Sequence, residues 1–266
     1  VDGKLELSLM EDNLFEMKDL KYTNFENLTF SQIRGIAFKS YDACEHITID
    51  NCRFENIGSY GIWQFSNKTA PVGQNTTQAS QFREGGCRYY VVKNCSFDNI
   101  GRNAISIRQS GSFNALEPGY SVIENNYFTN CVTTAGAGYC VMLEGIECSF
   151  NNNLVHNAHS ALTFLGVDNK IHSNEIYNIQ RYVSDAGALY TGRNFLMRGS
   201  VLYNNYVKDI SNKDPHMNTN YNRFVYLDDA QAGITVHNNI FVGNSHGGIR
   251  TIMCMTISLL MQIRHF

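Results

Sequence analysis

Two segments in the C-terminal half of the sequence carry aspartates that could perform acid–base chemistry. Asp185 lies in residues 184–193 (SDAGALYTGR), and Asp228 and Asp229 lie in residues 226–233 (YLDDAQAG). Two carboxyl groups that flank a glycosidic bond can hydrolyse it, one as the acid and the other as the nucleophile or as the base for water. Burial or mutual repulsion raises the pKa of one such group while the other stays ionised. These segments therefore suit glycoside hydrolysis if the fold brings them together.

The same two segments supply side chains that could hold a substrate. Tyr190 and Tyr226 could stack on a sugar ring, and Arg193 could bind the ionised carboxylate or a substrate hydroxyl. A structural interpretation stays open beside this one. In it, Asp185 caps a turn, and the Asp228-Asp229 pair forms ion pairs with Arg193 or Arg223.

A repeat along the chain indicates the elements that position these residues. The motif apolar-x-Asn-Asn/Cys-x-apolar-x-Asn-apolar begins at residues 25, 49, 92, 123, 150, 171, 202 and 236. The shortest interval, from 150 to 171, suits one coil of a β-helix, and the segments alternate apolar and polar residues as strands do. Residues 1–251 are therefore predicted to form an all-β fold, a right-handed parallel β-helix of about eight coils with a pectate-lyase-like architecture.

One position of the motif carries asparagine in five successive copies, at Asn126, Asn153, Asn174, Asn205 and Asn239. Asparagine tolerates the left-handed backbone of a tight corner, and its amide can bond to the same residue of the next coil, which predicts a ladder. Cys52 and Cys95 take this position in earlier copies. Adjacent coils would allow a disulfide, but two buried thiols are the preferred interpretation.

A second strand precedes each Asn motif and is predicted to point one row of side chains outward. The row contains Trp63, Ser106, Met142, Thr163, Tyr190, Tyr226 and Arg250, with Arg108, Glu144 and Asp228 two positions further along their strands. Aromatic rings interleaved with charges suit a polysaccharide groove. We therefore expect Trp63, Arg108, Glu144 and Arg250 to bind substrate beside Tyr190, Arg193 and Tyr226. Ordinary solvated decoration is the alternative.

At residues 185–193 (D-x-G-A-x-Y-x-G-R) and 226–229 (Y-L-D-D), the chain resembles the β-helix enzymes of glycoside hydrolase family 141. The resemblance covers roughly the C-terminal half. Members of the family act on α-L-fucosides and on xylan. The resemblance implies that Asp185 and one of Asp228 and Asp229 form the catalytic pair.

Two other functions fit the same fold. A polysaccharide lyase or uronate epimerase would use Ca²⁺ bound by acidic residues and a basic residue near the uronate, for which Glu144, Asp228, Asp229 and Arg250 are candidates. A non-catalytic β-helix would bind a glycan without forming product. The hydrolase requires neither a metal nor a cofactor, so Ca²⁺ is expected only for the lyase.

Composition and charge argue against nucleic acid and a membrane span, and the expected partner is a polysaccharide or oligosaccharide. A net charge of −3 and a pI near 6.2 give no basic surface for nucleic acid, and no apolar run is long enough to span a membrane. The chain opens at Val1 without a signal-peptide pattern, so we expect an excised or incomplete piece whose N-terminus does not indicate export. A secreted, periplasmic or cell-surface location is expected for a protein that acts on polysaccharides. Residues 66–88 suggest a surface loop with glycosylation sequons at Asn67 and Asn75. Residues 252–266 lose the repeat, which predicts a truncated or frameshifted tail, with a terminal cap strand as the alternative.

Overall fold

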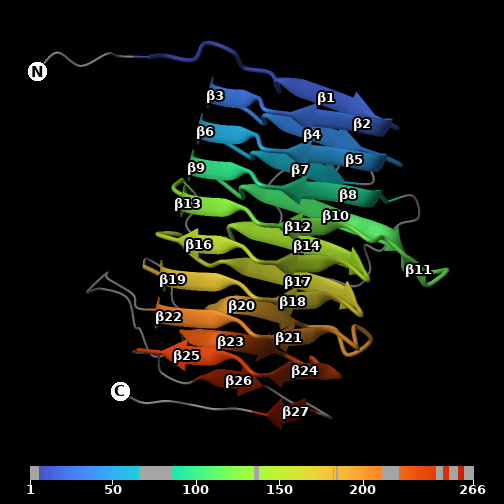
Figure 1. Cartoon of the computed structure of the whole chain (residues 1–266), viewed down its shortest axis with the longest axis vertical. Helices are drawn as coiled ribbons and strands as arrows, with labels where there is room; N and C mark the ends of the chain where they lie inside the picture. The colour runs from blue at the N-terminus through green and yellow to red at the C-terminus, as the bar shows by residue number, and fades with distance from the viewer. Residues whose placement is uncertain are drawn as a thin grey trace, which may run out of the picture.

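The structure is a computed structural model that describes residues 6–65, 86–134, 138–181, 183, 185–210, 222–243, 248–251 and 257–260. These residues form strands and no helix. Each coil contributes one strand to each of three sheets, and successive coils lie on one another in parallel (Figure 1). The third sheet has eight strands, so the described residues complete eight coils. The predicted all-β parallel β-helix is confirmed.

The first sheet contains the strands that carry the candidate site residues. In spatial order these are β1 (Phe15–Lys18), β4 (Phe38–Tyr41), β7 (Ile62–Phe65), β10 (Ile105–Ser112), β14 (Val141–Ile146), β17 (Leu162–Val167), β20 (Gly187–Gly192), β23 (Arg223–Asp228) and β26 (Ile249–Thr251). The short strand β11 (Glu117–Pro118) pairs with β10 in antiparallel orientation.

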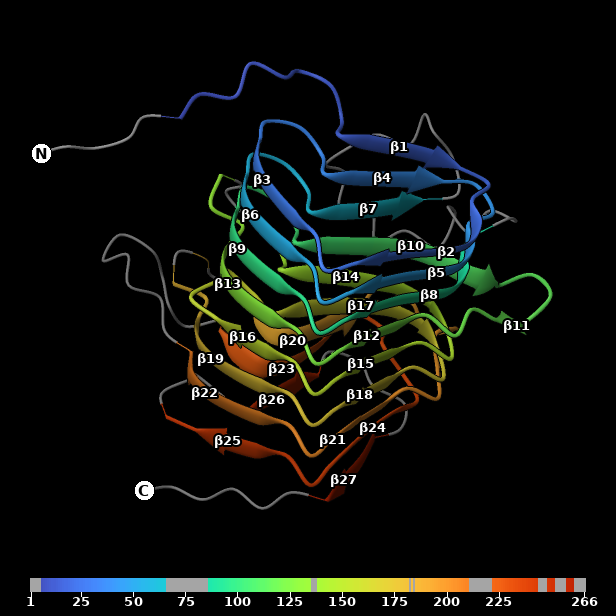
Figure 2. The same ribbon diagram turned by 45° about the horizontal axis from the view of Figure 1, so that its top comes forward.

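The other two sheets close the coil (Figure 2). The second consists of β2 (Lys21–Glu26), β5 (Glu45–Asp50), β8 (Arg88–Lys93), β12 (Val122–Glu124), β15 (Ser149–Asn151), β18 (Lys170–His172), β21 (Val201–Tyr203), β24 (Ile234–His237) and β27 (Ile257–Leu260). The third consists of β3 (Thr29–Ile33), β6 (Arg53–Ile57), β9 (Ser96–Ile100), β13 (Tyr127–Cys131), β16 (Leu154–His156), β19 (Glu175–Ile179), β22 (Tyr206–Ile210) and β25 (Ile240–Val242).

The core is a column of apolar side chains that runs along the inside of the coils. The inward positions of the first sheet are fully buried and lie in register: Phe38, Ile62, Ile105, Val141, Leu162, Leu189 and Val225. Phenylalanines of the third sheet stack on one another from coil to coil, with the Phe54 and Phe97 ring centroids 4.7 Å apart. Truncating one such residue to alanine typically costs about 2–5 kcal/mol, so this column stabilises the coil stack strongly.

An asparagine ladder links the coils at the corner between the second and third sheets. The Asn126 amide donates to the Asn153 side-chain oxygen at 3.1 Å, and the same bond joins Asn153 to Asn174, Asn174 to Asn205, and Asn205 to Asn239. These side chains are buried, and each amide also donates to a backbone carbonyl of an adjacent strand. The predicted ladder is confirmed.

The left-handed backbone expected at the ladder position lies one residue earlier. Asn125 and Asn152 each have φ of 54°, and their exposed amides form a second, outer row of bonds. Two properties that the sequence suggested for one asparagine therefore belong to two consecutive ones. The inner residue satisfies buried polar groups, and the outer residue makes the turn.

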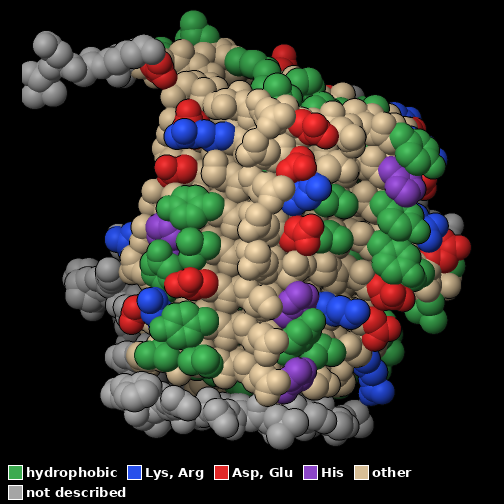
Figure 3. Space-filling model, in the orientation of Figure 1, with side chains coloured by type: hydrophobic (Ala, Val, Ile, Leu, Met, Phe, Trp, Pro, Cys, Tyr) green, Lys and Arg blue, Asp and Glu red, His purple; other side chains and the backbone are tan. Residues whose placement is uncertain are grey.

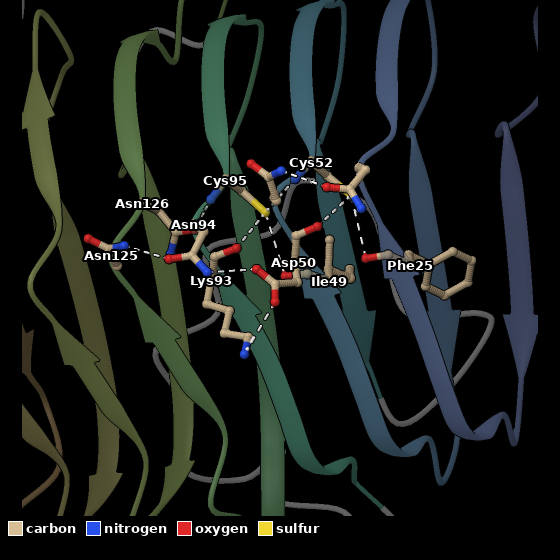
Figure 4. Close-up of polar contacts among 11 residues, drawn as sticks. Phe25, Ile49, Asp50, Cys52, Lys93, Asn94, Cys95, Asn125 and Asn126 are labelled. Carbon is tan, nitrogen blue, oxygen red and sulfur yellow. Dashed lines mark hydrogen bonds and ion pairs between the residues drawn. The ribbon is translucent and has the colours of Figure 1, made fainter.

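Cysteines continue the ladder in the N-terminal coils without forming a disulfide. Both Cys52 and Cys95 are free and buried, as the preferred interpretation predicted. The Cys95 N–H donates to the Asn126 side chain at 2.9 Å, and the Cys52 N–H donates to the Cys95 sulfur at 3.4 Å (Figure 4). A thiol thus replaces the amide at the ladder position.

The segment after residue 251 contributes a further strand. The loss of the repeat predicts no additional coil there, yet β27 pairs in parallel with β24 and extends the second sheet. A strand at this edge agrees with the alternative of a terminal cap, while the boundary at residue 251 stays a prediction. Residues 66–85 of the predicted loop, with the sequons at Asn67 and Asn75, lie outside the described residues, and Arg88 at its predicted end begins β8.

Candidate active site

The predicted outward row of the first sheet is aligned across the strands. Direct pairing joins Trp63 to Ser106, Ser106 to Met142, Met142 to Thr163, Thr163 to Tyr190, Tyr190 to Tyr226, and Tyr226 to Arg250. From Trp63 to Tyr226, however, every member is at most 6% exposed. The row is therefore not the open groove that the sequence suggested over its whole length.

Three predicted substrate-binding residues lie apart from the aspartates. Trp63 packs in an apolar cluster with Ile36, Tyr60 and Phe65. It stands on β7, four strands before β20, which at ~4.8 Å per strand is about 19 Å.

Arg108 and Glu144 form a buried ion pair, with the Arg108 Nε 2.8 Å from a Glu144 oxygen. The Arg108 guanidinium also lies over the Phe65 ring, 4.9 Å from its centroid. The structure therefore joins Arg108 and Glu144 to each other. Binding roles for Trp63, Arg108 and Glu144 stay predictions.

The remaining predicted residues gather around two tyrosines on paired strands. The Tyr190 hydroxyl on β20 donates to Asp228 Oδ2 at 2.9 Å, and the Tyr226 hydroxyl on β23 donates to Asp185 Oδ1 at 3.1 Å. The two rings meet edge to face with centroids 5.6 Å apart. Asp185 and Asp228, far apart in the sequence, are thus held by two neighbouring side chains.

A tight turn before β20 holds Asp185. The residue has φ of 56°, which an aspartate tolerates better than most residues do. The Asn222 amide donates to the Val183 carbonyl, and the Arg223 N–H donates to the Ala186 carbonyl, so the turn is fastened to the start of β23. Arg250 Nη1 lies 3.8 Å from the Asp185 carboxylate, while its guanidinium covers the Tyr226 ring at 5.2 Å.

Two glycines of β20 leave space for side chains of the neighbouring strand β23. A Cβ at Gly187 would lie 2.8 Å from the Tyr226 Cβ, and a Cβ at Gly192 would lie 2.6 Å from the Asp228 Cβ. Any larger residue would push β23 away from β20. The pattern Gly-x-x-x-x-Gly in β20 therefore leaves room for the two β23 residues that build the site.

The carboxylates differ sharply in their contact with solvent. The Asp228 side chain is 9% exposed, whereas those of Asp185 and Asp229 are 64% and 59% exposed. Arg193 Nε lies 3.7 Å from Asp228 and 3.9 Å from Asp229, and the Arg193 backbone N–H donates to the carbonyls of both. Arg193 itself has φ of 66°, a left-handed conformation that recurs at the corners of this β-helix.

Both tyrosines have pKa values raised well above the usual range. Burial is the largest cause, and hydrogen bonding to the Asp228 carboxylate adds to it. For Tyr226 the charges of both Asp228 and Asp185 raise the pKa, so the two carboxylates act on a single hydroxyl. The pKa of Arg193 is raised too, first by Tyr190 and then by the adjacent aspartates. The tyrosines therefore remain hydrogen-bond donors at neutral pH.

Tyr139 is a site residue that the sequence did not reveal. Its ring lies 5.4 Å from that of Tyr190, and burial raises its pKa well above the usual range. It precedes β14 outside the repeat, so no periodic signal could have identified it. Together with the burial of Tyr190 and Tyr226, this contact leaves little ring surface for the expected stacking on a sugar.

The described residues contain no group of three His, Cys, Asp or Glu side chains placed to hold a metal ion. The acidic set considered for Ca²⁺ is divided, because Glu144 pairs with Arg108 while Asp228 and Asp229 lie near Arg193. In the same part of the chain, no helix is long and apolar enough to cross a membrane.

Comparison with known proteins agrees with this architecture. A family model described as the right handed beta helix region matches residues 83–257. The chain belongs to this right-handed β-helix family. No curated protein matches it in sequence.

Two solved structures share the fold of this β-helix protein. One is titled a glycoside hydrolase, at 18% identity and a TM-score of 0.55 over 80% of this chain. The other is a double mutant of the tailspike protein of E. coli bacteriophage HK620, at 10% identity and a TM-score of 0.59 over 92% of this chain. The chain spans 36% and 41% of their respective lengths.

Proposed function

We propose that this β-helix protein hydrolyses glycosidic bonds in a polysaccharide or oligosaccharide, with Asp185 and Asp228 as the carboxyl pair. The observation that carries the proposal is the convergence of both carboxylates on the paired residues Tyr190 and Tyr226. A structural neighbour titled a glycoside hydrolase supports it at the level of the fold. Two carboxyl groups at one site are the minimal apparatus of this reaction.

The contacts of the two carboxylates support different roles within the pair. Asp228 is almost enclosed, accepts the Tyr190 hydrogen bond and faces Arg193, contacts that support a role as the nucleophile or as the base for water. Asp185 would then be the acid, once a bound substrate excludes the solvent that now reaches its exposed side chain. Asp229 is equally exposed and is the second candidate for the acid.

The proposal extends to family, cofactor and location. The two segments that resemble glycoside hydrolase family 141 lie on paired strands and build one site, which supports membership of that family. The carboxyl pair needs no cofactor for hydrolysis. A glycan substrate favours a secreted, periplasmic or cell-surface location.

A reducing-sugar release screen over plant and algal glycans tests the proposed function. Asp228→Asn should lower the rate by about 10²–10⁴-fold, as expected when an acid or base is lost, and Asp185→Asn should do the same. Asp12→Asn, at an exposed aspartate of the N-terminal segment, is the control and should retain the wild-type rate. Added EDTA should leave the rate unchanged.

The outcomes separate the three functions. If both site variants match the wild-type rate, the assignment of the pair is wrong. Loss of activity with EDTA and release of unsaturated products would identify a lyase. Glycan binding without any product would identify a non-catalytic β-helix, and the site variants would then leave cleavage at zero throughout.

A further inference from the structure

Four bulky residues at one corner of the N-terminal coils have a left-handed backbone. Tyr22, His46, Tyr89 and Tyr120 have φ of 51°, 54°, 52° and 51°. The register passes over Tyr22 and His46, because Lys21 pairs with Glu45 and Thr23 pairs with Ile47. Each of these two strands has one residue at this point, so the register continues without a shift and the corner is a matched left-handed residue in both coils. We call these four residues the aromatic ridge.

The ridge is a continuous stack of four rings, of which the three tyrosines are exposed. Successive centroids from Tyr22 to Tyr120 are 4.7, 4.4 and 5.4 Å apart, with interplanar angles of 9°, 7° and 28°. Tyr22, Tyr89 and Tyr120 are 76%, 37% and 40% exposed. Figure 3 shows hydrophobic and histidine side chains aligned in a column over the sheet that contains β2, β5 and β8.

The backbone does not require aromatic residues at this corner. The next coils have the same positive φ at Glu147 and Asp168, and the last ones use Gly199 and Gly233. A bulky residue in this conformation is energetically unfavourable, and glycine would avoid the cost. Three exposed tyrosines and one histidine at four successive coils therefore indicate a use at the surface.

The two cations beside the ridge form ion pairs, and the acidic Glu147 takes the same corner position in the next coil. Lys21 Nζ lies 3.2 Å from Glu45, and Arg88 Nη1 lies 3.2 Å from Glu117. What the ridge offers to a ligand is therefore uncharged: phenol hydroxyls, ring edges and the outer face of Tyr22. Hydroxyls donate and accept hydrogen bonds as sugar hydroxyls do, and an exposed aromatic face packs against the C–H groups of a sugar.

We propose that the aromatic ridge binds a neutral polysaccharide chain that runs parallel to the axis of the β-helix. The ring spacing follows the coil spacing of ~4.8 Å, which is close to the length of one sugar residue in an extended glycan. One sugar would then lie against each coil. The paired charges favour a neutral glycan over a polyanionic one.

The ridge is separate from the candidate active site. It lies at the start of β2, β5 and β8 and just before β12, whereas Asp185 precedes β20 and Asp228 ends β23 in the first sheet. Tyr120 lies in the coil of β12, and the first of the two aspartate segments lies in the coil that contains β20 and β21. Three steps separate these coils, about 14 Å at ~4.8 Å each. This surface would hold a glycan without cleaving it, so the inference goes beyond the proposed hydrolysis.

Binding measured in the Asp228→Asn background tests the ridge independently of catalysis. The probes are cellohexaose, xylohexaose and mannohexaose as neutral glycans and oligogalacturonate as the anionic one, titrated calorimetrically. Tyr89→Ala with Tyr120→Ala should weaken binding of a neutral probe by about tenfold, or ~1.4 kcal/mol, because two of the ring contacts are lost. Tyr22→Ala, at the exposed end of the stack, should weaken it less.

A matched control removes a stacked tyrosine elsewhere on the same sheet. Tyr203 lies between His172 and His237, with centroids 4.6 and 5.3 Å away, and its variant Tyr203→Ala should bind as the parent does. Circular dichroism confirms that each variant is folded. The proposal is overturned if no neutral hexasaccharide binds, if oligogalacturonate alone binds, or if the ridge variants bind as tightly as Tyr203→Ala. These outcomes do not depend on whether the protein cleaves glycans.

Discussion

Replacing Gly192 by alanine tests the geometry of the candidate active site most directly. The added Cβ would lie 2.6 Å from the Asp228 Cβ and 2.8 Å from the Asp228 carbonyl oxygen. Part of this clash is with backbone, so a side-chain rotation cannot relieve it and β23 must move. Overpacking of this kind typically costs about 1–3 kcal/mol. A shift of about 1 Å in a catalytic group can lower the rate about 10²-fold.

Gly58 provides a control with an equal clash far from the aspartates. A Cβ there would lie 2.6 Å from the Arg34 carbonyl oxygen, in the N-terminal coils of the β-helix. Both variants should unfold at lower urea concentration than the wild type. Only Gly192→Ala should also lose about 10²-fold in kcat while the protein remains folded. Gly187→Ala, which displaces Tyr226, should resemble Gly192→Ala.

Two results would refute this geometry. If Gly192→Ala leaves both stability and kcat at wild-type values, β20 and β23 do not approach each other as described. If Gly58→Ala loses as much activity as Gly192→Ala, the loss reflects general destabilisation and says nothing about Asp228.

Three further predictions concern the coil stack. Asn174→Ala should destabilise the fold by about 1–3 kcal/mol, because its ladder neighbours lose buried hydrogen-bond partners, whereas the exposed Asn24→Ala should change the urea midpoint little. Burial lowers the pKa of three histidines in the folded protein, so their protonation favours the unfolded chain. The free energy of unfolding should be highest above about pH 6.5 and should fall as the pH decreases toward the pKa values of the folded state, which urea titrations at pH 7.5 and 5 would measure. The three are His156, His159 and His172. Burial raises the pKa of Cys95 to about 12, so iodoacetamide at pH 8 should not modify this thiol until urea unfolds the chain. Mass spectrometry would detect the modification, and rapid alkylation of the native protein would contradict the burial of Cys95.

The sequence determined the fold and its register. Period-two alternation required strands, and the recurrent asparagine required each coil to lie directly on the last, because only that stacking satisfies its buried amide. Alignment of the coils then followed by counting along each strand. The outward row from Trp63 to Arg250 is for this reason in the predicted register at every step. The same counting brought Asp228 close to the segment of Asp185.

Only the tertiary structure decided which of these residues are accessible and which contact one another. Burial of the outward row depends on residues outside the repeat, such as Tyr139, whose positions no periodicity fixes. The pairing of Arg108 with Glu144 depends on the lengths of two side chains on adjacent strands. The need for glycine at two positions of β20 becomes evident only from the structure, where Tyr226 and Asp228 lie against them. A repeat specifies the backbone of each coil locally, whereas covering and contact arise between segments that the sequence does not place relative to one another.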